Sequence, residues 1–286
     1  MKIRLHGGKM AEAKNRDLLN PGSGKPEITD RLHWNISSNV LCNYMKEQEY
    51  LDMILQNRAI IPRYVIEPIA YLGLGNFKNI CFPMTCFCDI PFSKVSSHMS
   101  RYGGYGIGLD KETVLNKYRI QPIQYINTKS PLADDFKQAF LSFLEYDREI
   151  DGIHKVLSDF LISALVYMKP VWGYETDSNG NLKNYIYQDE CEWRYIPSDR
   201  FPKGLDLILP QDMTNNHAKE IFSKVLRSHK ECWLQFEWQD VRYILVPDEE
   251  AARKTITTIN SLSMMDEEKH MLMAKVEISS CFADNL

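Results

Sequence analysis

The chain has 286 residues, of which 44% are hydrophobic and 25% are charged, a composition typical of folded globular proteins. Its formal net charge of -4 provides no global positive field, so nucleic acid is not indicated as a partner. No uninterrupted apolar stretch of about 18 residues occurs, which argues against a membrane span. The seven cysteines are scattered and no secretory signal precedes them. We therefore expect a cytoplasmic protein with reduced thiols.

The domain organisation is expected to be simple. The first segment, 1–30, lacks hydrophobic periodicity and contains the sequence PGSG at 21–24, which is typical of a mobile arm. After it, no linker rich in proline, glycine or serine divides the chain. Residues 31–286 are therefore expected to form a single domain.

Strand and helix patterns alternate through the first half of this domain. In chain order we expect a strand at 32–36, a helix at 47–58, an extended segment at 59–67, a buried strand at 80–88, a helix at 92–102, a strand at 105–109, a helix at 111–117 and a strand at 122–126. Pro91 is suited to begin the helix at 92–102, and Asp110 is suited to cap the helix at 111–117.

The second half begins with two helices at 132–146 and 152–168, an all-helical insertion at about 131–169. Strands at 172–176 and 182–187 flank the hairpin-turn sequence SNG, and a strand at 190–196 is expected to continue or pair with that hairpin. A helix at 216–228, strands at 233–236 and 240–246, a helix at 249–262 and a strand at 275–279 complete the chain. These patterns predict an α+β fold with a mixed, mainly antiparallel sheet and flanking helices.

Cys86, Cys88 and His98 have the side chains of zinc ligands. No second Cys-x-x-Cys or histidine pair completes a tetrahedral set, so we expect no metal site and interpret the cysteines as buried and inert. Asp89, which precedes Pro91, is interpreted mainly as a helix cap.

Several motifs resemble those of AbiGi, a bacterial abortive-infection family associated with phage resistance. The resemblance rests on LHW at 32–34, PRY at 62–64 with Glu67, FPMTCFCDIP at 82–91 followed by GGYGIG at 103–108, ECEWR at 190–194 and VRYILVP at 241–247. It implies a role in phage defence, as the antitoxin partner of a toxin protein encoded nearby.

A more distant resemblance is to ADP-ribosyltransferases, in which an early histidine and a late Glu-x-Glu serve one site. It implies that Glu192 is catalytic and stabilises an oxocarbenium-like transition state, that Glu190 orients the acceptor, and that His33 with Trp34 binds NAD. Tyr102 or Tyr105 would stack on nicotinamide. A carboxylate suits this chemistry because it stabilises a developing cation.

Structural interpretations compete with these roles. Glu190 and Glu192 with Arg194 also fit a solvent-facing edge strand with a cross-strand ion pair. His33 fits a hydrogen-bonded histidine, and the glycines from 103 to 108 fit a helix end and a tightly packed strand.

Three functions therefore remain open at this level: a regulator of a toxin partner, an NAD-dependent ADP-ribosyltransferase-like enzyme, or a domain that binds a nucleotide ligand without turnover.

Overall fold

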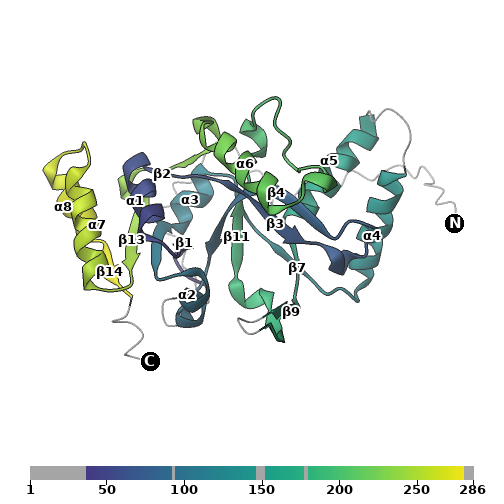
Figure 1. Ribbon diagram of the computed structural model, residues 1–286, viewed down its shortest axis with the longest axis horizontal. Coiled ribbons are helices and arrows are strands. Elements are labelled where there is room, and N and C mark those ends of the chain that lie inside the picture. Colours follow the sequence, from purple (N-terminus) through teal and green to yellow (C-terminus); the bar gives the residue numbers. More distant parts are fainter. Residues whose placement is uncertain (1–36, 92–93, 146–151, 177–179, 280–286) are drawn as a thin grey trace, which may run out of the picture. The chain divides into compact units, whose positions relative to one another are not determined.

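The computed structural model describes residues 37–91, 94–145, 152–176 and 180–279 (Figure 1). The expected arm at 1–30 and strand at 32–36 lie outside the described residues, as do His33 and Trp34. The described part combines helices with a mixed, mainly antiparallel sheet, which confirms the α+β class.

One sheet of eight strands forms the centre of the described part. Its order is β14-β13-β5-β1-β4-β11-β6, and β3 also pairs with β4. The pairing of β13 with β14 is parallel and the others are antiparallel. The bounds are β1 Val40–Met45, β3 Arg63–Pro68, β4 Asn79–Cys88, β5 Tyr105–Asp110, β6 Ile120–Pro122, β11 Glu192–Tyr195, β13 Val241–Val246 and β14 Val276–Ile278.

Three two-stranded sheets accompany the main one. They pair β2 (Ala59–Ile60) with β12 (Leu234–Gln235), β7 (Gln124–Ile126) with β8 (Met168–Pro170), and β9 (Trp172–Thr176) with β10 (Leu182–Ile186). The last pair is the hairpin predicted from the sequence.

The α-helices of the described part are α1 Gln48–Asn57, α2 Ser96–Tyr102, α3 Lys111–Lys117, α4 Pro131–Leu144, α5 Gly152–Val166, α6 Asn216–Arg227, α7 Glu249–Ser261 and α8 Asp266–Met273. The Asp110 carboxylate accepts a hydrogen bond from the Thr113 amide and caps α3, as predicted. None of these helices combines the length and apolarity that crossing a bilayer requires.

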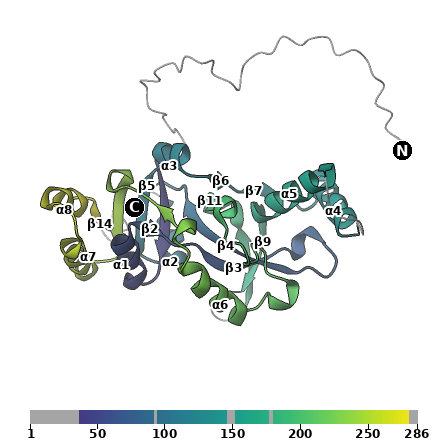
Figure 2. The same cartoon turned by 90° about the horizontal axis from the view of Figure 1, so that it is seen from above.

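The described part has two main hydrophobic cores. Figure 2 shows α1, α7 and α8 at one end of the sheet and α4 and α5 at the other. One core joins α1, α3, α7 and α8 to β1, β5 and β13, with Leu41, Leu55 and Ile244 at its centre. The other joins α4 and α5 to the first part of β4, with Phe82, Phe136 and Leu161 at its centre. The stretch predicted to be a helical insertion thus supplies one of the two cores.

Three elements were not predicted from the sequence. Strand β8 (Met168–Pro170) occupies the end of the stretch that was expected to be all-helical, because α5 ends at Val166 and β8 pairs with β7. Strand β1 is a mostly buried run without a clear alternation of polar and apolar residues, so periodicity does not reveal it. Helix α8 has an acidic first turn, and Leu272 is its buried residue, so its pattern is equally weak.

Three sequence predictions are corrected by the observed pairings. The strand expected at 190–196 does not pair with the hairpin, because β11 lies between β4 and β6 in the main sheet and Glu190 lies on a 3-10 turn. The strand expected at 122–126 is divided: β6 ends at Pro122, and β7 pairs with β8 in another sheet. The regular helix expected from 92 begins at Ser96, so Pro91 is not in its first turn.

Candidate functional site

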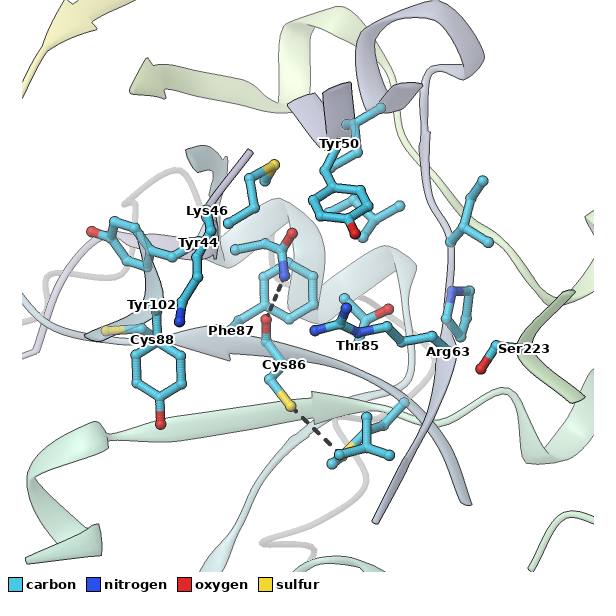
Figure 3. Close-up of a pocket in the computed structure, with 18 of the residues that line it drawn as sticks. Tyr44, Lys46, Tyr50, Arg63, Thr85, Cys86, Phe87, Cys88, Tyr102 and Ser223 are labelled. Atoms are coloured by element: carbon cyan, nitrogen blue, oxygen red, sulfur yellow. Dashed lines mark hydrogen bonds between the residues drawn. The ribbon is translucent and has the colours of Figure 1, made fainter. Parts of the chain in front are cut away.

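A cavity lies where strands β1 and β4 part. Strand β1 pairs with β5 along its whole length. It pairs with β4 at one position, where Cys42 lies opposite Cys88. Beside this pair, Asn43 Nδ2 donates to the Cys86 carbonyl at 2.8 Å. A cavity of about 680 Å³, named here the β1–β4 cavity, is lined by these two strands together with residues of α1, α2, α6 and β3 (Figure 3).

Glu192 lines this cavity from the start of β11 and is held between two cations. Its Oε1 accepts from Arg194 Nε at 2.6 Å, and its Oε2 lies 2.6 Å from Lys169 Nζ. Its side chain is only 7% exposed. Both carboxylate oxygens are therefore already engaged.

Arg194 extends this arrangement away from Glu192. Its guanidinium also bonds Glu67 Oε2 at 2.9 Å and donates to the Val166 carbonyl at 2.6 Å. Since the Arg194 side chain is only 1% exposed, these partners replace the hydration that the charge has lost. Glu67 belongs to β3 and Val166 to α5, so the guanidinium connects three elements.

Glu190 is buried beside the same ammonium group. Lys169 Nζ donates to its Oε2 at 2.8 Å, and the hydroxyl groups of Tyr102 and Tyr185 donate to its Oε1. Arg101 lies at the edge of this group and pairs with Glu175. Together, Glu67, Glu190, Glu192, Lys169 and Arg194 form what we call the buried ion network.

The backbone at Cys191 brings the two glutamates to one ammonium group. Cys191 has a φ of 43°, in the left-handed region that residues other than glycine seldom adopt. It joins the 3-10 turn Tyr187–Glu190 to β11, so Glu190 and Glu192 do not lie on one regular strand. Nevertheless, both carboxylates reach Lys169.

Burial and neighbouring charges shift the pKa values of Glu192 and Lys169 in opposite directions. Burial raises the pKa of Glu192, but the charges of Arg194 and Lys169 outweigh burial and lower it to about 2. Burial likewise lowers the pKa of Lys169, but Glu192, Glu67 and Glu190 raise it well above its ordinary value. Glu192 and Lys169 are thus held in their charged forms.

His98 lines the same cavity from α2 and has a different environment. Its ring lies 4.4 Å from the Tyr102 ring and 5.2 Å from the Tyr44 ring, measured between centroids. Burial lowers the pKa of His98 to about 4, although Glu190 acts in the opposite direction. The imidazole is therefore neutral near pH 7.

Comparison with known proteins supports one assignment. A family model described as "Putative abortive phage resistance protein AbiGi, antitoxin" matches residues 58–247. An abortive phage resistance protein AbiGi of Lactococcus lactis subsp. cremoris is 31% identical over 241 residues, which is 76% of this chain and 96% of that relative. The chain belongs to the AbiGi family. No solved structure gives a significant match.

Two of the AbiGi motifs identified in the sequence contribute to the buried ion network. The ECEWR motif at 190–194 provides Glu190, Glu192 and Arg194, and Glu67 follows the PRY motif. Arg194, named in the sequence only as part of a surface ion pair, is one of the most buried large side chains. The interpretation of this segment as a solvent-facing edge strand is therefore wrong.

Of the residues expected to bind NAD, the structure describes Tyr102 and Tyr105, and these two do not line the same cavity. Tyr102 lines the cavity, but its hydroxyl is bonded to Glu190. Tyr105 packs against the core of α1, β1 and β13 and is not among the residues that line the cavity. His33 and Trp34 lie outside the described residues. Since Glu192 is bound to two cations, its carboxylate is not free to bond a ribose hydroxyl.

Lys169 is the residue of this site that sequence reasoning did not identify. It follows the apolar helix α5 and lies on β8, where its ammonium group faces both glutamates. The only signal in the sequence is a charged residue at the end of a long apolar run. Such a lysine is more often solvent-exposed, so the signal does not predict burial.

The described residues contain no group of three His, Cys, Asp or Glu side chains placed to hold a metal ion. Cys86 and Cys88 lie two residues apart on β4, and Cys86 Sγ approaches Met84 Sδ at 3.6 Å. Burial raises the pKa of both thiols.

The glycines of the GGYGIG motif are explained by packing. Gly103 has a φ of 113°, and a Cβ atom there would lie 2.1 Å from the Met45 carbonyl oxygen. A Cβ atom on Gly108 would lie 2.7 Å from Val40 Cγ1. These glycines allow β5 to approach β1 closely, as the structural interpretation expected.

Proposed function

We propose that this member of the AbiGi family of abortive phage resistance proteins acts by binding and regulating a toxin protein encoded nearby. The antitoxin description of the matching family model supports such a partner. The structural observation that carries the proposal is an exposed apolar face on α5.

This face consists of large side chains at the spacing i, i+3, i+4 and i+7, and we call it the α5 stripe. Its members and their exposed fractions are Ile153 74%, Val156 64%, Leu157 45% and Phe160 65%. The opposite face of α5 is buried, with Leu161 and Leu165 in the core shared with α4. The stripe is thus not needed to pack α5 against the described part of the chain.

An unpartnered stripe of this kind suits a protein partner. A helix with anchors at this spacing typically enters an apolar groove on another protein. Contiguous apolar surface is otherwise costly to expose to water, because it promotes association with other molecules. We therefore assign the stripe to the contact with the toxin.

The test is co-expression of this chain with the toxic neighbouring gene, scored by growth. We expect the wild type to rescue growth and Phe160→Asp or Val156→Asp to fail, because a carboxylate in an apolar groove is not solvated. Lys155→Ala, on the same helix but outside the stripe, is the matched control and should rescue growth. Each variant is first checked for an unchanged melting temperature.

Rescue of growth by both aspartate variants would contradict this proposal. Loss of rescue by the Lys155→Ala control would show that the assay responds to any substitution on α5. The assay would then give no support to a toxin contact at the α5 stripe.

The alternative function is an NAD-dependent ADP-ribosyltransferase-like activity that uses Glu192. It is favoured by the presence of Tyr102, Glu190 and Glu192 in the lining of one cavity. The two cations on Glu192 oppose it, because they neutralise the carboxylate that would stabilise a developing cation. Release of nicotinamide by the purified chain, abolished by Glu192→Gln in a protein that still folds, would establish this activity in place of the first.

A further inference from the structure

The β1–β4 cavity contains basic side chains that the buried ion network does not use. Lys46, Arg63 and Arg227 line the cavity, and no ion pair or hydrogen bond joins their side chains to another residue of the described ranges. The remaining basic lining residues are engaged: Lys169 by Glu190 and Glu192, and Lys219 by Glu220.

The acidic residues of the lining do not balance these three cations. Glu67, Glu190, Glu192 and Glu220 are each held in an ion pair. Only Glu47 is without one within the described part of the chain. Counted together with Arg194, which pairs with Glu67 and Glu192, the lining has six cations and five carboxylates. The unpaired part consists of three cations and one carboxylate, so that part of the cavity favours an anionic occupant.

Two of the unpaired cations lie on either side of Cys86 in the cavity (Figure 3). Lys46 follows the end of β1 and Arg63 begins β3, and both extend their charged groups inward on either side of Cys86 (Figure 3). A guanidinium and an ammonium group directed at one space suit a phosphate, which accepts hydrogen bonds from both.

One buried hydroxyl of the lining has no hydrogen-bond partner in the described structure. Thr85 is 5% exposed and lines the cavity, and its Oγ1 makes no hydrogen bond in the described structure. It follows Met84, the residue opposite Arg63 in the pairing of β3 with β4. Since a buried polar atom without a partner is unfavourable, a ligand oxygen at this point would stabilise the site.

An aromatic ring covers another part of the same space. Tyr50 of α1 is 43% exposed, and its side chain extends into the cavity (Figure 3). The cavity volume of about 680 Å³ is in the range of sites for small ligands and cofactors. A flat ring on the ligand would stack on the exposed face of Tyr50.

We infer that the β1–β4 cavity binds a nucleoside phosphate. Lys46 and Arg63 hold its phosphate groups, the Thr85 hydroxyl donates to a phosphate oxygen, and Tyr50 stacks on the base. The contacting groups are distinct from Glu192, and the cavity does not include the α5 stripe, so this binding is independent of the proposed toxin contact.

Isothermal titration calorimetry on the full chain tests this inference with AMP, ADP, ribose 5-phosphate and inorganic phosphate as probes. We expect the nucleotides to bind more tightly than the other two and all affinities to fall with salt. Arg63→Ala and Lys46→Ala should each weaken nucleotide binding at least about tenfold, the effect of about 1.4 kcal/mol. Lys203→Ala, an exposed lysine outside the cavity, is the matched control and should leave affinity unchanged.

Tyr50→Ala separates the two parts of the ligand site. It should weaken binding of AMP and ADP but leave binding of inorganic phosphate unchanged. Absence of binding, affinity unaffected by Arg63→Ala, or inorganic phosphate binding as tightly as ADP would each overturn the inference. None of these outcomes depends on whether the chain rescues growth.

Discussion

At the scale of single residues, Glu192 is the carboxylate on which the buried ion network depends most. Its carboxylate forms ion pairs with two buried cations, Lys169 and Arg194, and offsets part of their positive charge. Removing one member of a buried pair leaves an uncompensated charge, which is more costly than loss of an exposed pair.

We therefore expect Glu192→Gln to lower the free energy of unfolding by about 3–5 kcal/mol, measured by urea denaturation. Glu250→Gln removes an exposed pair with Lys254 and should leave the free energy of unfolding nearly unchanged. Equal costs for the two variants would show that the network does not stabilise the fold.

The lowered pKa of His98 predicts that the free energy of unfolding depends on pH between about 4 and 6.5. Its pKa falls from an ordinary 6.5 to about 4 in the folded protein, so the unfolded chain binds more protons between these values. The His98 contribution to stability is complete above about pH 6.5 and is lost as the pH falls to about 4.

Urea midpoints measured from pH 7.5 to pH 4 test this dependence. His98→Asn should flatten the curve between pH 6.5 and pH 4, while His217→Gln, an exposed histidine on α6, should leave it as in the wild type. An unchanged slope in His98→Asn would contradict the assignment to this imidazole.

Residue identity in the candidate site was partly predictable from sequence. Glu190, Glu192 and Arg194 are recognisable because the motif places three charges in five residues. Their burial was not predictable, because charged residues are rarely buried and only the distant partners Lys169 and Glu67 make it favourable. Sequence spacing does not reveal such long-range compensation.

At the scale of elements, the contact of β5 with β1 depends on glycine. At Gly103 the neighbouring atoms are backbone atoms of Met45 and Lys46, which cannot rotate away from an added methyl group. The positive φ adds backbone strain for any other residue.

We expect Gly103→Ala to reduce the free energy of unfolding by about 3 kcal/mol, measured by thermal and urea denaturation. Gly106→Ala is the milder comparison variant. The atoms nearest to its added Cβ lie at 3.3 Å and the φ of Gly106 is not positive, so we expect a loss of about 1 kcal/mol in the free energy of unfolding. The reverse order of the two costs would contradict the packing explanation.

Element type was predicted more reliably than element pairing. Helices such as α6 and α7 show clear periodicity and lie where the sequence places them. The partner of β11 was mistaken, because a short strand next to a hairpin in sequence is normally expected to join it. The positive φ at Cys191 redirects the chain into the main sheet, and a cysteine gives no sign of this in the sequence.

At the scale of the whole described unit, the sheet has two parts that meet at β1 and β4. Strands β5, β13 and β14 lie on the side of β1, and strands β3, β6 and β11 on the side of β4. The β1–β4 cavity lies at their junction. The two parts separate because β1 and β4 pair only at Cys42 and Cys88. Local sequence patterns do not predict this, because strand pairing is a long-range property.

The position of β1 has a practical consequence for truncation. The family model matches residues 58–247, which exclude β1 although it lies between β5 and β4 in the sheet. A fragment cut at these limits would leave β5 without its neighbour and expose an unpaired edge to other molecules. We expect fragment 58–247 to aggregate during size-exclusion chromatography, whereas fragment 37–279 should elute as a discrete species. The limits of the family match are therefore not the limits of an autonomous folding unit.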